Sequence, residues 1–152
     1  MMNTVLDLRR EQASAAELMT HFLACDPAFL ASLRARTSLP DYASKLHARA
    51  LRFEAWSGGR LAGLLAVYHD ATAGVAYISN VSVLTEYCRQ GVASQMLTTC
   101  LAHARQQGLR AITLEVARDN QPAIALYRRH GFSPLPGADD ERLRMQLQFR
   151  HP

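Results

Sequence analysis

The alternation of apolar and polar residues divides the middle of the chain into strands and a helix. Residues 51–56 and 61–68 are short apolar runs separated by Gly58-Gly59, a pattern typical of a β-hairpin. A second turn leads to a third β-rich run, residues 75–83. Residues 92–104 then carry apolar side chains at every third or fourth position, which predicts an amphipathic helix. We therefore expect three antiparallel strands followed by a helix.

After this helix the pattern returns to alternation. Residues 111–117 alternate as a strand. Because a helix separates this strand from residues 75–83, we expect the two strands to lie parallel, joined by a right-handed crossover. Asn120 can cap a further helix. Residues 132–135 and 143–149 are predicted to end the chain as strands.

The amino-terminal third is less regular. Residues 3–9 alternate like a strand, and Ser14 has the sequence context of a helix cap. We expect Pro27 to end that helix, residues 28–40 to be irregular, and residues 41–50 to form a helix. No repeat, low-complexity tract or linker interrupts the chain. The sequence predicts one mixed α/β domain over residues 1–152.

Composition narrows the class of protein. The chain has 152 residues, of which 49% are apolar and 20% charged, enough for one globular core without disulfides or metal. No apolar run approaches the ~20 residues that span a bilayer, so we expect no membrane association. The three cysteines are an odd, widely spaced set without a CxxC pair. This favours reduced thiols in the cytoplasm over a disulfide framework or a zinc site.

The net charge of +4 comes from arginines, with Lys45 as the only lysine. A solvated basic surface explains this excess, and attraction of a polyanionic ligand is the alternative. The arginines are scattered and are not interleaved with aromatic residues. We therefore expect no nucleic-acid partner.

The turn between residues 83 and 95 carries the clearest chemical signal. It reads Arg89-Gln90-Gly91-Val92-Ala93-Ser94 and opens the predicted helix. Unpaired N–H groups and the positive end of the helix dipole favour an anion there, so we expect a phosphate-bearing ligand. Gly91 would let the backbone approach a pyrophosphate. Arg89 either adds a charged contact or points to solvent.

Other phosphate and metal motifs do not fit. A Walker loop needs a lysine after a glycine-rich turn, and Lys45 is far from one. A dinucleotide fingerprint needs three spaced glycines, whereas Gly91 stands alone. The histidines are too scattered to predict a metal site.

Residues 60–133 resemble the GCN5-related N-acetyltransferase (GNAT) superfamily. The six residues from Cys88 to Ala93 are similar to its motif [Q/R]-x-x-G-x-[G/A], with Gly91 and Ala93 in place and Cys88 at the position of the usual Gln or Arg. Leu114-Glu115-Val116, followed by Asn120, Ala123, Leu126, Tyr127 and Gly131-Phe132, looks like its second motif. The resemblance implies a GNAT-like fold, a largely antiparallel sheet with a central, splayed parallel pair flanked by helices. It also implies acetyl-CoA as cosubstrate and no metal.

The resemblance also implies roles for individual residues. Tyr127 would protonate the departing thiolate, although an apolar helix position also suits a core residue. Glu115 would take the proton of the amine, and the alternative is a water held by Ser79 or Asn80. Cys88 could be a nucleophile beside a helix start, but the superfamily usually transfers acetyl directly. The expected cofactor-binding residues are Val81, Val83, Arg89, Gln90, Gly91, Val92, Ala93, Ser94 and Asn120.

The function that follows from the resemblance is acetyl transfer to a primary amine. The acceptor could be a small amine, an amino sugar, an amino acid or a protein amino terminus. A non-catalytic acetyl-CoA-binding module is the alternative. Dimers are common in such folds, and the chain offers no pattern that decides for or against a homodimer.

Overall fold

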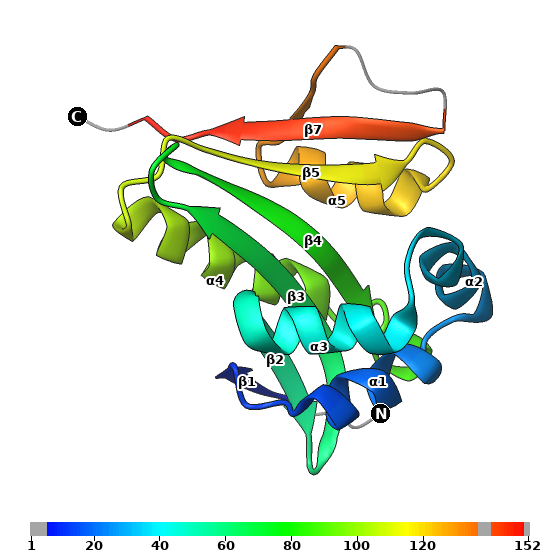
Figure 1. Cartoon of the computed structure of the whole chain (residues 1–152). Helices are drawn as coiled ribbons and strands as arrows, with labels where there is room; N and C mark the ends of the chain where they lie inside the picture. The colour runs from blue at the N-terminus through cyan, green and yellow to red at the C-terminus, as the bar shows by residue number, and fades with distance from the viewer. Residues whose placement is uncertain (1–5, 137–140, 151–152) are drawn as a thin grey trace.

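The computed structural model describes residues 6–136 and 141–150, which form one seven-stranded sheet with helices on both faces (Figure 1). The strand order is β1-β2-β3-β4-β5-β7-β6. The elements are β1 (Asp7–Arg10), α1 (Ala15–Leu23), α2 (Pro27–Arg36), α3 (Leu39–Arg49), β2 (Leu51–Ser57), β3 (Arg60–Asp70), β4 (Val75–Val83), the short 3-10 helix η1 (Thr85–Tyr87), α4 (Val92–Gln106), β5 (Ala111–Ala117), α5 (Gln121–Arg129), β6 (Ser133–Pro134) and β7 (Arg142–Gln148).

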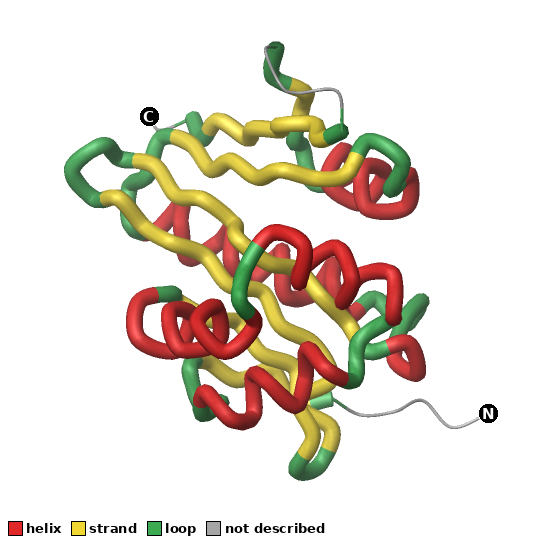
Figure 2. Tube along the Cα trace, turned by 45° about the vertical axis from the view of Figure 1, so that its right-hand side comes forward, coloured by secondary structure: helices red, strands yellow, loops and turns green. Residues whose placement is uncertain are grey.

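All neighbouring strands are antiparallel except β4 and β5, which are parallel as predicted. These two strands pair only from Val75 to Ile78, against residues 111–114. Beyond this point β4 stays with β3 as far as Val83, and β5 stays with β7 as far as Ala117. The two strands therefore separate in the middle of the sheet (Figure 2). We call the point of separation the fork.

A β-bulge in the β3–β4 pair lies next to the fork. Ala66 pairs with Asn80 and Val67 with Ile78, so Ser79 is the extra residue of β4. Side chains alternate between the two faces of a sheet along a regular strand. The extra residue shifts this alternation, so residues after the bulge face the opposite side from the one that the alternation before it would give them. Ile78 packs in the core beneath α4, whereas Asn80 is buried on the opposite face of the sheet.

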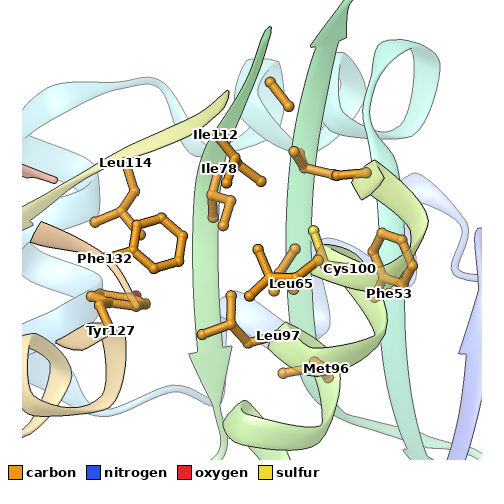
Figure 3. Close-up of a cluster of buried hydrophobic side chains, with 14 of the residues drawn as sticks. Phe53, Leu65, Ile78, Met96, Leu97, Cys100, Ile112, Leu114, Tyr127 and Phe132 are labelled. Atoms are coloured by element: carbon orange, nitrogen blue, oxygen red, sulfur yellow. The ribbon is translucent and has the colours of Figure 1, made fainter. Parts of the chain in front are cut away.

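Two apolar cores lie on the two faces of the sheet. One is formed with α4 and α5 and includes the stripe predicted for residues 92–104 (Figure 3). The other lies beneath α1, α2 and α3. Gly63 on β3 lets α4 approach closely, since a Cβ at this glycine would lie 2.9 Å from Val92 Cγ1. The helix that follows the fork is therefore held firmly against the sheet.

A buried ion pair joins the second core to the amino-terminal segment. Arg52 Nε lies 3.2 Å from a Glu54 carboxylate oxygen, and both residues are almost fully buried. Glu54 also accepts the N–H of Ala13 and the indole N–H of Trp56. Arg52 donates to the carbonyls of Ala13 and of the last turn of α3. Because both charges are fully hydrogen-bonded, the pair fixes the start of α1 and the end of α3 on β2.

The structure corrects the prediction for the amino-terminal third. Residues 28–40 were expected to be irregular, but α2 spans most of this segment. Pro27 begins α2 rather than simply ending α1, because Asp26 caps the helix by accepting the N–H groups of Ala28 and Phe29. α3 begins at Leu39, two residues before the predicted start. The strand predicted for residues 3–9 is β1, and residues 3–5 lie outside the described residues.

A buried histidine in α1 stands behind the far end of β4. His21 Nδ1 lies 2.8 Å from the Leu61 carbonyl, and its Nε2 lies 2.8 Å from Ser82 Oγ. Since a carbonyl only accepts, Nδ1 carries the proton and Nε2 accepts from the hydroxyl. Asn80 Nδ2 in turn donates to Ser82 Oγ at 2.9 Å. Burial, the largest cause, lowers the pKa of His21 from 6.5 to about 4. This series of hydrogen bonds therefore requires the neutral imidazole.

His21 should therefore make the free energy of unfolding depend on pH. Its pKa is lower in the folded than in the unfolded chain, so its contribution is complete above pH 6.5 and is lost as the pH falls towards 4. The shift corresponds to roughly 3 kcal/mol. We expect urea unfolding of His21→Gln to show a weaker pH dependence between these limits, while His47→Gln, at an exposed position of α3, keeps the wild-type slope. Equal slopes for all three proteins would contradict the assignment.

Candidate active site

The turn before α4 presents an open helix end. Gly91 is the N-cap with φ +79°, and no side chain caps the helix. The first backbone hydrogen bond runs from Gln95 N–H to the Gly91 carbonyl, at 2.9 Å. The N–H groups of Val92, Ala93 and Ser94 precede this bond and point out of the helix end. A Cβ placed on Gly91 would meet nothing within 4 Å, so no other part of the described chain crowds the turn at this residue.

The side chains of the turn are tied to their surroundings in different ways. Ser94 Oγ lies 2.9 Å from His130 Nε2, which connects the start of α4 to the end of α5. Gln90 donates to the Glu86 carbonyl, and the carboxylate of Glu86 pairs with Arg60 at the start of β3. Arg89 is exposed and has φ +65°. The contact of Ser94 with His130 could not be predicted from the sequence, because the two residues are 36 positions apart and belong to different helices.

Cys88 points away from the helix start. Its thiol donates to the carbonyls of Val83 and Leu84, at 3.7 and 3.6 Å. The residue that departs from the family motif thus closes the turn at the end of β4. All three cysteines of the chain are free thiols.

Val81 and Val83 lie on the part of β4 that has lost its neighbour. Each is paired with β3 on one side, to Leu65 and Gly63 respectively. Among the described residues no strand pairs with the other edge of β4 beyond Ile78. Their side chains are half-buried against the core beneath α4. The free backbone edge of this segment can therefore pair with an extended ligand.

Tyr127 is held on the α5 side of the sheet (Figure 3). Its ring is buried and packs edge-on against Phe132, with centroids 5.9 Å apart. Burial raises the pKa of its phenol to about 12, so the hydroxyl is protonated at neutral pH. Within the described parts of the chain, no residue is hydrogen-bonded to this hydroxyl, and it is not among the fully enclosed polar atoms without a partner. It can therefore donate to a ligand.

Glu115 lies on the other face of the sheet. It is half-buried on β5, between Leu114 and Val116, whose side chains enter the core beneath α4 and α5. Its neighbour across the β5–β7 pair is Arg144. The structure therefore places Glu115 and Tyr127 on opposite faces of the sheet.

The alternative water-holding residues are already engaged. Ser79 Oγ lies 2.7 Å from the hydroxyl of Tyr42 on α3, a contact that the sequence did not indicate. Asn80 belongs to the buried chain with Ser82 and His21. Asn120 is the predicted helix cap, since its side chain accepts the N–H of Ala123 at 3.3 Å. Of these polar residues only Ser79 lies at the bulge itself.

Comparison with known proteins now identifies the family. Residues 15–132 match the model of the acetyltransferase (GNAT) family. The chain belongs to the GNAT family. Over 95 residues, 60% of this chain and 61% of the relative, it is 30% identical to the [ribosomal protein bS18]-alanine N-acetyltransferase of Escherichia coli strain K12. It is 39% identical over 62 residues to the chloroplastic GCN5-related N-acetyltransferase 4 of Arabidopsis thaliana, which is 41% of this chain and 21% of that protein. The chain spans less than two thirds of these relatives.

Solved structures confirm the GNAT fold over nearly the whole chain. The E. coli ribosomal-protein-S18-alanine N-acetyltransferase superposes with a TM-score of 0.79 and 20% identity, covering 97% of this chain and 96% of that one. The PaiA N-acetyltransferase of Thermoplasma acidophilum, in complex with coenzyme A, gives a TM-score of 0.76 and 16% identity over 95% and 99% of the two chains. The predicted mixed sheet with its splayed parallel pair is thus confirmed as that of a GNAT protein.

Two absences complete the description of the GNAT domain. In residues 6–136 and 141–150, no helix is both long and apolar enough to cross a membrane. Over the same ranges, no three His, Cys, Asp or Glu side chains gather as metal ligands would.

Proposed function

We propose that this protein is an acetyl-CoA-dependent N-acetyltransferase that acts on a primary amine. The observation that supports this most is the uncapped start of α4 at the end of a strand whose edge is free. The family match and the N-acetyltransferase names of the relatives agree with it. The three free thiols also suit the reducing cytoplasm as its location.

The chain offers groups suited to two parts of acetyl-CoA, its pyrophosphate and its amide-containing arm. The N–H groups of Val92, Ala93 and Ser94 would receive the pyrophosphate, and Arg89 would add a charged contact. The free edge of β4 at Val81 and Val83 would pair with the amide-containing arm. This arrangement directs the thioester towards the fork.

The reaction would proceed by direct attack. The amine nitrogen forms a bond to the thioester carbonyl carbon, negative charge grows on the carbonyl oxygen, and the carbon–sulfur bond breaks. Glu115, directly or through water, takes the proton that the amine loses. Tyr127 donates a proton to the departing sulfur. Holding amine and thioester in line supplies much of the rate.

Gly91→Leu should weaken coenzyme A binding by at least about tenfold, because a side chain would enter the open space before the amides. Isothermal titration calorimetry measures this. The matched control is Gly108→Leu at the other end of α4, where φ is +73° and a Cβ also meets nothing within 4 Å. Both variants carry the same left-handed backbone strain of about 1 kcal/mol. The phosphate site is therefore supported only if Gly91→Leu weakens coenzyme A binding and Gly108→Leu does not.

Tyr127→Phe should lower kcat by about 100-fold and leave the affinity for coenzyme A unchanged, since only the donor to sulfur is lost. Stability should not fall, because the hydroxyl has no protein partner among the described residues. Tyr68→Phe is the control, as it removes another unpaired hydroxyl from β3. Unchanged kcat in Tyr127→Phe would rule out the donor role. If the protein binds coenzyme A but releases no thiol from acetyl-CoA with any amine tested, the result would support the non-catalytic module instead.

Glu115→Gln separates the two candidate bases. If the carboxylate takes the proton, kcat/KM at neutral pH should fall by about 100-fold. Asp119→Asn, an exposed carboxylate just beyond β5, should retain wild-type activity. A fall of less than about threefold in Glu115→Gln would instead assign the role to a water near Ser79.

A further inference from the structure

Three arginines from two separate elements lie around Glu115 on the face of the sheet opposite α4 and α5. We call Arg36, Arg142 and Arg144 the arginine cluster. Arg144 is the cross-strand neighbour of Glu115, and both residues are on the same face because paired residues of adjacent strands point the same way. Arg142 Nη2 donates to the Glu115 carbonyl at 3.2 Å. Two members of the cluster are therefore fixed to the strand that borders the fork.

The third member comes from α2, the helix that the sequence did not predict. Arg36 is exposed in the last turn of α2 and interacts electrostatically with Glu115 and Arg142. The contact between Tyr42 and Ser79 holds the following helix on β4, which keeps the end of α2 over this face. Figure 1 shows α2 next to the separating ends of β4 and β5. The cluster thus spans both sides of the fork.

Tyr77 on β4 lies among the same charged groups. Its side chain is 39% exposed, and burial and then the charge of Glu115 raise its pKa, whereas Arg142, Arg36 and Arg144 act to lower it. Arg36 and Arg144 alone outnumber Glu115, so the excess of positive charge does not depend on how Arg142 is paired. The opposite face of the sheet is filled by the core beneath α4 and α5. An acceptor therefore has to approach the fork through this positively charged face.

We propose that the acceptor is an amine that carries a carboxylate close to its nitrogen. The amine would reach Glu115 while the carboxylate is held by Arg36 and Arg144, because guanidinium groups bind carboxylates in a planar, often bidentate geometry. A neutral amine would bring no carboxylate to Arg36 and Arg144, and a polycationic amine would be repelled by them. This inference rests on the proposed acetyl transfer and specifies its substrate class.

Two sources can supply this chemistry, a free amino acid or a protein amino terminus followed by an acidic residue. A panel of matched pairs distinguishes them. The first pair is leucine and leucinamide, and the second is the dipeptide amides Met-Asp and Met-Asn. Spermidine represents cationic amines. Release of coenzyme A is measured with each at saturating acetyl-CoA, and rates are expressed per unprotonated amine.

The wild-type enzyme should prefer the acid of at least one pair by about tenfold or more in kcat/KM, and that pair identifies the source. Arg36→Glu should raise KM for the preferred acid by about tenfold and leave KM for acetyl-CoA unchanged. Arg34→Glu, at an exposed position of the same helix turn, is the matched control and should behave like wild type. Because KM for the same substrate is compared between variants, differences in basicity between the amines of the panel do not affect this comparison.

The two possible failures give different results. Transfer to amide or spermidine that equals or exceeds transfer to the acids overturns the anionic acceptor but leaves acetyl transfer in place. An equal rise in KM for Arg34→Glu and Arg36→Glu overturns the role of the cluster. Coenzyme A binding without transfer to any amine overturns both the proposed function and this inference.

Discussion

The functional architecture depends on one constraint, that β4 and β5 are hydrogen-bonded partners for only four residues each. Past Ile78 and Leu114 each strand keeps a single neighbour, β3 for one and β7 for the other. A row of unpaired backbone groups in the middle of a sheet would be costly without a partner. A ligand with amide groups would remove that cost. The free edge of β4 leads through the turn after it to the open start of α4. The proposed donor binding and the sheet geometry would therefore both follow from the short pairing of β4 with β5.

The far end of β4 has to stay in place although one edge is free. Its rear face is fixed by polar rather than purely apolar contacts: the bulge residue Ser79 to Tyr42, and the buried chain of Asn80, Ser82 and His21. Such chains fix one geometry because a buried hydrogen-bonding group that loses its partner costs free energy. The protein's own hydrogen bonds thus hold the position of the β4 edge without a ligand, which would lower the entropy cost of ordering it on binding.

Elements with a strong periodic pattern of apolar residues could be predicted from the sequence. The strand 75–83 and the strand 111–117 have the bounds that alternation predicts, and Gly91 caps α4 as the turn indicated. α2 was missed because only Leu33 is buried along it, so it has almost no apolar stripe. The Asp26-Pro27 pair was a usable signal, since proline suits the first turn of a helix as well as the end of one. His21 could not be singled out, because its partners lie 40 and 61 positions away. The role proposed for Arg36 could not be predicted for the same reason, because its proximity to Glu115 depends on where α2 ends in the folded structure.

The placement of Tyr127 and Glu115 on opposite faces fits the direction of the proposed reaction. In a direct attack the incoming nitrogen and the departing sulfur lie on different sides of the carbonyl carbon, so a proton acceptor and a proton donor are needed in different places. Tyr127 sits in the core beneath α5, away from bulk solvent, where a neutral phenol is favoured. Glu115 sits on the face that carries the arginine cluster. The sheet therefore separates an apolar environment around Tyr127 from a charged one around Glu115, and this separation would allow one domain to hold the proposed acid and base for the same transfer.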